Sequence, residues 1–487
     1  MGMTPLNLLV LMSDEHNPKF LKAAGHPFIE TPNLDALAAR GTRFASAYTT
    51  CPICVPARAA FAVGRYVHDI GYWDNADGYD GAVPSWHHAL RDAGHRVVSI
   101  GKLHFRGRPG DDHGLSEEIV PMHIVEGVGD VKGLIRENIP KRKGGDKIAR
   151  RAGPGESFYT AYDRDIAARA QVWLHEEAPK WCDRPWVLFV SFALPHFPLT
   201  APPHWFYRYW RQELPLPKLY ARESRPHHPY LDDYARTVDY DTHFTCAADV
   251  KRAIAGYSGL VSTMDENVGN VLRALRDTGL ESGTRVIYTS DHGDNVGARG
   301  LWGKSTLYEE SVGVPLLLAG PGVPAGRVIE TPVSHIDCAP TILEAAGEAP
   351  RVGGRDLPGA SLFALASGAV PARPVISEYH ASGSVAAAYM LRFGRFKYCH
   401  YVAYRPQLFD LAEDPEELVD LADDPRYAAT LGECQRRLRA ALDPEATDAR
   451  AKRRQAELLA RFGGREKALA RGDLGFTPAP GTAAEMN

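Results

Sequence analysis

Near the start of the sequence, Asn7-Leu8-Leu9-Val10-Leu11-Met12 is followed directly by the polar group Ser13-Asp14-Glu15-His16. A short continuous apolar run is typical of a strand that is covered on both faces in a parallel sheet. Similar runs alternate with helical segments along the chain. The predicted strands are 96–100, 186–190, 285–289 and 314–318, and the predicted helices are 33–40, 86–93 and 260–276. This alternation predicts an α/β protein with a large, mostly parallel or mixed central sheet flanked by helices.

Polar side chains follow three of the predicted strands. These groups are Asp14 with Glu15, Lys102 with His104, and Asp291 with His292. Ligands of open α/β sheets bind beyond the carboxyl ends of the strands. We therefore expect the three groups to form one shared site.

The pattern divides the chain into three predicted units. Residues 1–370 form the large α/β domain that carries the site, and 371–443 form a smaller α+β subdomain of short strands and a helix. The tail, 444–487, contains a charged helix with few apolar anchors, which we expect to dock on another subunit of a homo-oligomer. The long irregular segments 106–160 and 197–245 are predicted to wall the binding site.

Composition excludes several classes of protein. The 487 residues include 56 Lys and Arg and 60 Asp and Glu, so the net charge of −4 provides no basic field for nucleic acid, and 44% are hydrophobic, which excludes a disordered chain. No apolar run is long enough to span a membrane, and residues 1–10 lack the features of a secretory signal. Seven scattered cysteines do not resemble a disulfide framework. We expect a cytoplasmic protein without membrane or nucleic-acid partners.

The segment Cys54-Val55-Pro56-Ala57-Arg58 places a cysteine just before a predicted helix, with an arginine one turn later. A helix N-terminus and a neighbouring arginine lower the pKa of a thiol, which predicts a reactive Cys54. Cys51 and Cys54 could also be a redox pair or half of a zinc site, and Cys54 could be a structural thiol. The chain shows neither the small βαβ unit of a thioredoxin-like protein nor a second Cys/His pair that would complete a zinc site. A cysteine phosphatase does not fit either, because Arg58 follows Cys54 too closely.

Cys54-x-Pro56-x-Arg58, with Gly64-Arg65 downstream, resembles the signature of the type I, formylglycine-dependent sulfatases of the alkaline phosphatase-like superfamily. Other family landmarks follow in the same order, to about residue 421. They are Asp14, Gly101-Lys102-Leu103-His104, Pro195-His196, Asp291-His292-Gly293, Lys304 with Tyr308-Glu309, and Leu408-Phe409-Asp410-Leu411 with Asp414-Pro415. Several matches in register make the resemblance specific.

The resemblance implies metal-dependent hydrolysis of sulfate monoesters. A formylglycine-generating enzyme would convert Cys54 to formylglycine (3-oxoalanine), whose hydrate is the nucleophile. One hydroxyl of the hydrate attacks sulfur and the alcohol leaves, and the second hydroxyl then expels sulfate and restores the aldehyde. The family's usual metal is Ca²⁺, and a nitrogen ligand makes Mn²⁺ or Mg²⁺ the alternatives. The implied ligands are Asp14, Glu15, Cys54, Asp291 and His292.

The resemblance also implies roles for the other polar residues. Arg58 and Lys102 would hold and polarise the hydrate, and His104 would take the hydroxyl proton when sulfate leaves. His196 and Lys304 would bind the sulfate oxygens and protonate the leaving alcohol. Lys102 also counts among the residues that contact the substrate.

The substrate is predicted to be a small aryl or alkyl sulfate ester. Asn75 is a candidate for a hydrogen bond to it. Aromatic residues of the segment 197–245 are candidates to pack its alcohol, and aromatic faces attract the quaternary ammonium of a choline-type ester. These residues are Trp205, Phe206, Tyr207, Tyr209 and Trp210.

Two other functions are compatible with these residues. Related phosphonate monoester and phosphodiester hydrolases share the formylglycine, the metal and the motif Asp291-His292. The basic pair Lys102 and His104 favours the sulfatase, because the phosphonate hydrolases carry hydroxyl residues there. The second alternative is a homologue whose Cys54 stays a thiol and which only binds anions.

Overall fold

A computed structural model describes residues 4–484, and a mixed eight-stranded sheet runs through its centre in the order β11-β2-β10-β9-β1-β7-β4-β5. The strands are β1 (Asn7–Asp14), β2 (Gly41–Phe44), β4 (Val97–Lys102), β5 (Glu117–Met122), β7 (Val187–Pro195), β9 (Thr284–Ser290), β10 (Leu316–Ala319) and β11 (Arg327–Ile329). β1 pairs in parallel with both β7 and β9, and β4 continues the parallel order, whereas β10 is antiparallel to β9 and β2. The predicted fold class is confirmed.

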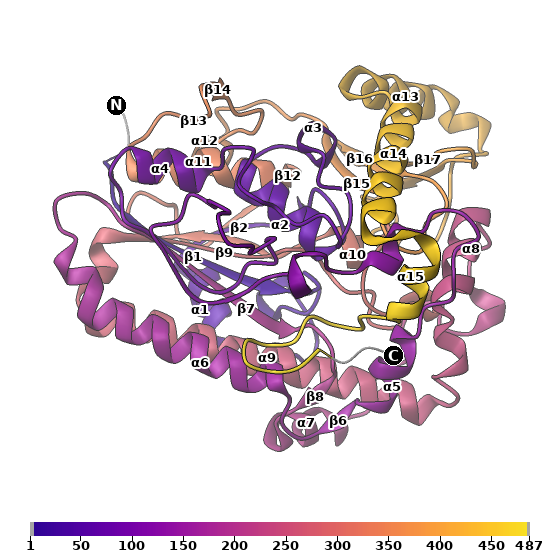
Figure 1. The fold of residues 1–487 in the computed structure, drawn as a ribbon, viewed down its shortest axis with the longest axis horizontal. Coiled ribbons are helices and arrows are strands. Elements are labelled where there is room, and N and C mark those ends of the chain that lie inside the picture. Colours follow the sequence, from indigo (N-terminus) through magenta and orange to yellow (C-terminus); the bar gives the residue numbers. More distant parts are fainter. Residues whose placement is uncertain (1–3, 485–487) are drawn as a thin grey trace.

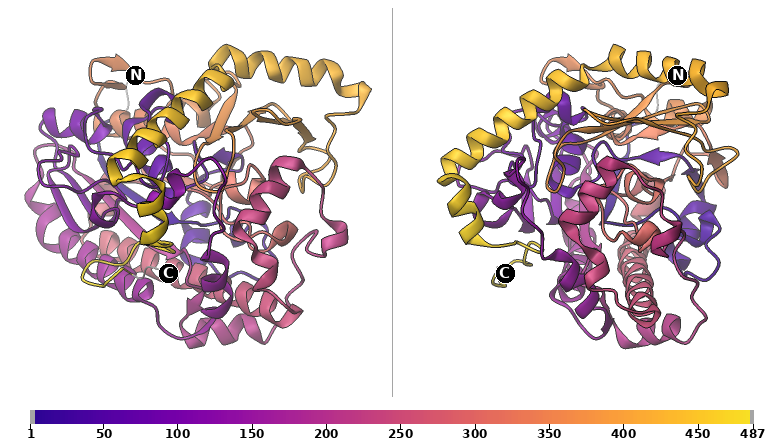
Figure 2. Two further views of the ribbon diagram at one scale, coloured as in Figure 1. Left: turned by 45° about the vertical axis from the view of Figure 1, so that its right-hand side comes forward. Right: turned by 90° about the vertical axis from the view of Figure 1, so that its right-hand side faces the viewer.

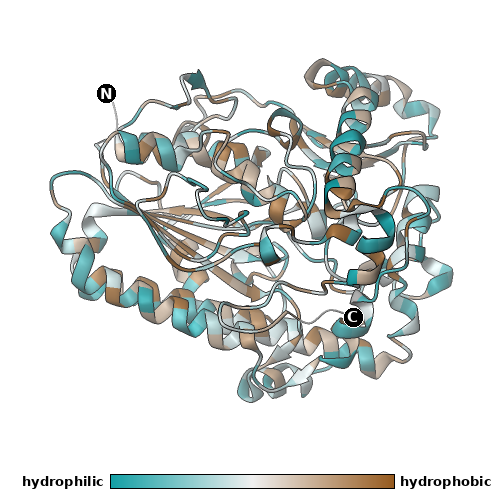
Figure 3. Cartoon of the chain, viewed as in Figure 1, coloured by the Kyte–Doolittle hydropathy of each residue, from teal (hydrophilic) through white to brown (hydrophobic). Residues whose placement is uncertain are grey.

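Helices cover both faces of the sheet (Figure 1). The first strand shows why its sequence is apolar throughout, because Leu9 and Leu11 pack into the core on one face while Leu8 and Val10 pack on the other. Figure 3 shows the same arrangement as hydrophobic strands between helices with hydrophilic outer faces. Helices on the first face include α1 (Pro32–Ala39), α5 (Gly144–Arg150), α6 (Phe158–Val172), α7 (Pro203–Trp210) and α9 (Ala247–Asp277). Helices on the second include α2 (Cys54–Val63), α4 (Trp86–Asp92), α11 (Cys338–Ala346) and α12 (Leu362–Ser367).

The C-terminal part contains an antiparallel sheet in the order β15-β16-β17-β18. Its strands are β15 (Val375–Tyr379), β16 (Ala388–Phe393), β17 (Phe396–Tyr401) and β18 (Gln407–Asp410). Helix α13 (Ala428–Ala441) packs on this sheet, and α14 (Pro444–Phe462) and α15 (Gly464–Arg471) follow. Figure 2 shows α14 and α15 running along the outside of the molecule.

Besides 3-10 and π-helical turns, the described chain has six more strands and three more α-helices. They are the strand pairs β3 (Ala47–Tyr48) with β12 (Val333–Ser334), β6 (Gly153–Pro154) with β8 (Thr200–Ala201), and β13 (Arg351–Val352) with β14 (Arg355–Asp356), and the helices α3 (Val67–Ile70), α8 (Pro229–Val238) and α10 (Glu309–Val312). Within residues 4–484, none of the helices combines the length and the apolar character needed to cross a bilayer.

Two sequence expectations differ from the structure in detail. The segment 197–245 contains α7 and α8 rather than only loop, and the helix predicted over 260–276 begins at Ala247. Gly256 lies inside this longer helix, where a Cβ atom would come within 2.3 Å of the Leu199 carbonyl oxygen. The close approach of the Leu199 backbone to this helix therefore requires glycine at position 256. Glycine weakens the sequence pattern that predicts a helix.

The charged tail helix finds a surface on its own chain. The buried side chain of Gln455 in α14 donates to Asp74 Oδ2 at 3.2 Å and to the His380 carbonyl at 2.8 Å, and it accepts from Arg136. Docking on a second subunit is thus not needed to cover this helix, and a homo-oligomer stays a prediction.

Candidate active site

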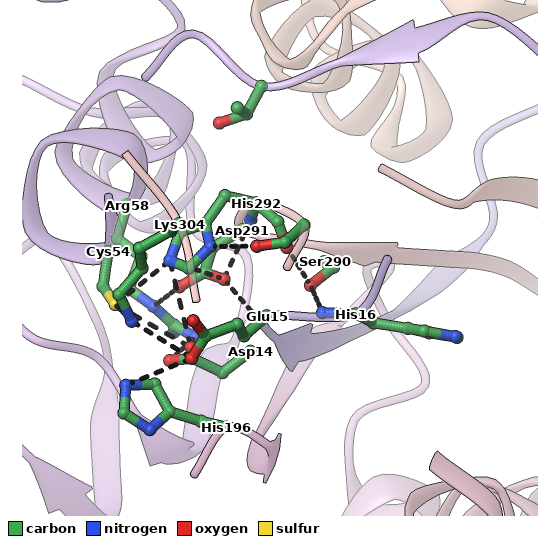
Figure 4. A network of polar contacts seen from close by, with 12 residues as sticks. Asp14, Glu15, His16, Cys54, Arg58, His196, Ser290, Asp291, His292 and Lys304 are labelled. Carbon is green, nitrogen blue, oxygen red and sulfur yellow. Dashed lines mark hydrogen bonds and ion pairs between the residues drawn. The ribbon is translucent and has the colours of Figure 1, made fainter. Parts of the chain in front are cut away.

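The carboxyl ends of four parallel strands bring the predicted residues together (Figure 4). Asp14 ends β1 and Lys102 ends β4, while His196 follows β7 and Asp291 follows β9. Glu15 and His104 have positive φ angles of 69° and 55°. Such strained backbone in non-glycine residues is concentrated at functional sites. His16, in contrast, points away from the cluster (Figure 4).

Cys54 is the first residue of α2 and is buried at the centre of the cluster. Its Sγ lies 3.2 Å from His292 Nε2, 3.3 Å from Lys304 Nζ and 3.8 Å from Asp14 Oδ1. Burial and the neighbouring Asp14 raise the pKa of the thiol to about 11. The expected lowering of this pKa is therefore wrong, because Arg58 is already paired with carboxylates and the thiol is excluded from water.

Arg58 connects four groups around the cluster. Its guanidinium donates to Asp291 Oδ2 at 2.8 Å and to Asp14 Oδ2 at 3.3 Å, and also to the Lys102 carbonyl and the Ser191 hydroxyl. Burial opposes its charge, but both carboxylates outweigh that effect and raise its pKa. Arg58 thus fixes the carboxylates in place, and Ser191 is a contact that the sequence did not reveal.

Lys102 reaches the cluster through an irregular end of β4. Its Nζ forms a buried ion pair with Asp14 Oδ2. The register shifts between Ile100 and Lys102, and the glycine between them has φ 105°; a Cβ at Gly101 would come within 2.2 Å of the Ser191 carbonyl oxygen. Burial raises the pKa of Asp14, but Lys102, His196 and other nearby cations reverse this and hold it well below the usual range.

His104 is a buried histidine whose two ring nitrogens have no hydrogen-bond partner among the described residues. Burial, Lys102 and Arg58 hold its pKa well below the ordinary value, so the ring is neutral at pH 7. Because it lines the cavity beside Cys54, His104 has a free lone pair where a proton acceptor is needed.

His196, Lys304 and Glu15 form a second group at the cavity. Glu15 Oε2 lies 3.4 Å from His196 Nε2 and 3.2 Å from Lys304 Nζ. Burial opposes the charge of Lys304, but Cys54 and Glu15 outweigh it and raise its pKa, so that Lys304 stays protonated. Burial and Lys304 lower the pKa of His196, whose Nδ1 donates to the Phe197 carbonyl at 2.7 Å.

The donor set around Cys54 fits a divalent cation. One ligand atom each from Asp14, Cys54, Asp291 and His292 all lie within 4.8 Å of one another. Glu15 Oε1 is buried without a hydrogen-bond partner, and burial raises the pKa of this carboxyl well above its usual range. Carboxylate oxygens and an imidazole nitrogen suit hard and borderline divalent ions, and a cation would satisfy the unpartnered oxygen.

Asn75 lies in the cavity wall, but its side chain also has a structural contact. Asn75 Oδ1 accepts a hydrogen bond from the Val55 backbone amide at 3.1 Å. This amide belongs to the first turn of α2, where no residue of the helix can pair with it. Asn75 therefore holds the helix end that presents Cys54.

The cavity beside Cys54 has a volume of about 160 Å³ and is walled as expected by both long segments. The segment 106–160 contributes Asp130 and Arg142, and the segment 197–245 contributes Phe197, Tyr234 and Tyr240.

The aromatic residues of α7 are not in this wall. Phe206 and Tyr209 are buried in the core beside α9, and Tyr207 is exposed. The expectation that this group packs the substrate alcohol is wrong, because its helical spacing serves core packing.

The sequence interpretation also missed part of the wall. Asp473 and Phe476, beyond the last helix, line the cavity. Their only local signal is a few apolar residues after a charged helix.

Comparisons with known proteins identify the family of this chain. Residues 6–348 match the sulfatase family model, and residues 297–443 match the model described as N-sulphoglucosamine sulphohydrolase, C-terminal. Choline-sulfatase of Rhizobium meliloti (strain 1021) is 34% identical over 85% of this chain and 81% of that protein. Arylsulfatase K of Danio rerio is 30% identical over 85% of this chain and 79% of that protein.

A solved structure shares the fold. The phosphonate monoester hydrolase of Agrobacterium radiobacter superposes with a TM-score of 0.74 at 24% identity, over 89% of this chain and 95% of that chain. Fold and comparisons together define a hydrolase of the alkaline phosphatase-like superfamily. Within it, the chain belongs to the sulfatase family, the sulfuric ester hydrolases.

Proposed function

We propose that this sulfatase hydrolyses small aryl or alkyl sulfate monoesters with residue 54 as formylglycine. The observation that carries the proposal is the position of Cys54, which lines the cavity and whose Sγ lies within 3.8 Å of Asp14, His292 and Lys304. The raised pKa of the thiol argues against a thiolate nucleophile. Oxidation to an aldehyde gives the same position a hydrate oxygen that can attack sulfur.

Asp14, Asp291 and His292 would hold a divalent cation together with Glu15 and residue 54. When bound, such a cation polarises the sulfate ester and lowers the pKa of a hydroxyl beside it. We propose Ca²⁺, with Mn²⁺ and Mg²⁺ as the alternatives that His292 permits.

Three residues of the chain would orient the site and accept the proton of the hydrate. Arg58 orients Asp14 and Asp291. The ammonium group of Lys102 pairs with Asp14 as well. Neutral His104 accepts the hydroxyl proton of the hydrate as sulfate is expelled. Its unpartnered nitrogens support this role.

Lys304 and His196 face the sulfate on the leaving-group side. Protonated Lys304 donates hydrogen bonds to the sulfate oxygens and supplies the proton that the departing alcohol requires. His196 would bind the sulfate beside it with its ring protonated, because Nδ1–H is held by the Phe197 carbonyl and only a protonated Nε2 can donate to an anion. Asn75 contributes to the wall near the alcohol.

Maturation, assembly and location extend the proposal. A formylglycine-generating enzyme would act on Cys54 before folding, because the thiol is buried in the folded chain. We further propose that the molecule is a cytoplasmic homo-oligomer. We also keep the division into units 1–370, 371–443 and 444–487.

The test is a rate comparison on protein produced with and without a formylglycine-generating enzyme. We expect turnover of 4-nitrophenyl sulfate and choline sulfate to exceed that of phenyl phosphonate, and to follow the fraction of residue 54 converted in intact-mass spectra. Cys54→Ser, which retains an unconverted hydroxyl, is the matched control and should be inactive. Faster turnover of the phosphonate would favour the phosphonate hydrolase, and full activity with an unmodified thiol would refute the mechanism.

A further inference from the structure

Residues 473–477, here called the strap, form part of the cavity wall although they lie far along the chain from the site. Figure 1 shows the chain after α15 crossing back over the molecule. All five strap residues line the cavity that contains Cys54. The strap and Cys54 therefore face the same cavity.

Asp473 anchors the beginning of the strap. Its side chain is buried, and its carboxylate lies 3.0 Å from Lys132 Nζ and 3.4 Å from Arg142 Nε. The backbone amide of Lys143 donates to the same carboxylate at 2.9 Å. Three contacts to the segment 106–160 fix where the strap enters the wall.

Phe476 anchors the middle of the strap. The ring is 5% exposed, and its centroid lies 4.9 Å from that of Phe158 and 6.4 Å from that of Phe197. The cationic groups of Lys147 and Arg151 lie 4.6 Å and 5.5 Å from the ring centroid. These contacts are typical of a side chain with one defined position.

Tyr159 of α6 joins the strap to the groups that handle the sulfate. Its hydroxyl donates to the Thr477 carbonyl at 2.6 Å. Its ring meets the His196 ring edge-on, with centroids 5.7 Å apart, and Lys102 Nζ lies 5.8 Å from its centroid. One buried side chain therefore contacts the strap and two proposed site residues.

We propose that the strap positions His196 and Lys102 through Tyr159. The inference rests on the proposed sulfatase function. Tyr159 is a positioning residue, because its hydroxyl is used by Thr477 and its ring packs against the two site residues without reaching the reacting group. Phe476 acts one step further away, by holding the strap against Tyr159 and Phe197.

The experiment compares Tyr159→Phe, Phe476→Ala and the double variant in the matured enzyme. Tyr159→Phe keeps the ring and removes only the bond to the strap. We expect each single change to lower kcat for 4-nitrophenyl sulfate by about tenfold to 100-fold and to raise KM by a smaller factor. The double variant should be no worse than the more severe single variant, because both changes release the same element.

Tyr162→Phe is the matched control. Tyr162 also lies on α6, and its hydroxyl donates to the Val120 carbonyl at 2.7 Å, but neither residue lines the cavity. The control should have the same melting temperature as Tyr159→Phe and unchanged kcat. Full activity of both single variants, or losses that multiply in the double variant, would overturn the proposal.

A binding measurement separates this inference from the proposed function. In the Cys54→Ala background, calorimetry with inorganic sulfate should show weaker binding after Tyr159→Phe but not after Tyr162→Phe. Equal sulfate affinity in all three proteins refutes the positioning role even if the enzyme is a sulfatase. A wild-type enzyme without sulfatase activity refutes the proposed function, whereas weakened sulfate binding would still support the strap.

Discussion

Arg58 shows how much of the site depends on the shape of one side chain. Its guanidinium donates to two carboxylates, a carbonyl and a hydroxyl in a site excluded from water. A lysine retains the charge but not the planar arrangement of donors. The positions of Asp14 and Asp291 therefore depend on arginine rather than on positive charge alone.

Arg58→Lys is expected to lower kcat/KM by about 100-fold or more while the protein still folds. The loss arises because the carboxylates and the Lys102 segment lose their common partner. Steady-state kinetics with 4-nitrophenyl sulfate measure the loss of kcat/KM. The control is Arg65→Lys, because the Arg65 guanidinium donates only to the backbone carbonyl of Asp356 in the described structure. Activity equal to wild type would show that charge alone is sufficient.

His87 predicts a pH effect that is independent of catalysis. Burial lowers its pKa from 6.5 to about 3, and its Nε2 has no hydrogen-bond partner among the described residues. In the unfolded chain His87 becomes protonated below about pH 6.5, whereas in the folded chain it becomes protonated only near pH 3. The stabilising contribution of neutral His87 is therefore complete above pH 6.5 and is lost as the pH falls from 6.5 towards 3.

The change that tests this is His87→Gln. Between pH 5.5 and pH 4, the free energy of unfolding of wild type should fall more steeply than that of the variant, by about 1.4 kcal/mol per pH unit for one proton. Urea denaturation at several pH values gives both slopes. Parallel slopes would mean that His87 is protonated in the folded protein.

At the scale of the element, helix α2 depends on a residue outside it. Asn75 Oδ1 accepts from the Val55 amide, and the N-cap residue Ile53 provides no side-chain acceptor. Asn75→Ala should cost about 1 kcal/mol of unfolding free energy because the amide loses its partner. It should also reduce kcat, since Cys54 begins this helix. Asn75→Asp retains the acceptor and should restore the stability; equal stability of all three proteins would contradict this account.

Strands and their ends were predictable from sequence because their causes are local. The apolar run from Leu8 to Met12 predicts a strand buried on both faces, and Asp14 follows it directly. Tyr159 and Phe476 could not be recognised in this way, because their roles arise from contacts across the chain. The thiol pKa of Cys54 was misjudged for the same reason: burial and Asp14 are tertiary effects.

At the scale of the whole molecule, a buried charge network joins the C-terminal sheet to the large domain. Lys397 of β17 lies 2.9 Å from Glu309 Oε1 and 2.7 Å from Glu417 Oε1, and its side chain is fully buried. Tyr48 donates to Glu309 Oε2 from the large domain. The proposed units 1–370 and 371–443 therefore share an interface that excludes water, and we expect them to unfold together.

Lys397→Met should destabilise the protein by about 3–5 kcal/mol, because it removes the cation that pairs with the buried Glu417 and the partly buried Glu309. Lys141→Met is the surface control: Lys141 pairs with Asp239 at 3.0 Å in solvent and should contribute at most about 1 kcal/mol. Calorimetry should show one transition in wild type. A wild type that melts in two separate steps, or a Lys397→Met variant as stable as Lys141→Met, would show that this interface does not couple the units.

The course of the chain after α15 has a practical consequence for handling the enzyme. A purification tag fused behind residue 487 would be tethered ten residues after Thr477 in the cavity wall, and we expect bulk there to reduce the access of the ester. The first described residues, which lead into β1, lie on the side of the molecule away from α15 (Figure 1). A cleavable tag is better placed at that end. We expect the activity of C-terminally tagged protein to be lower than that of the untagged enzyme.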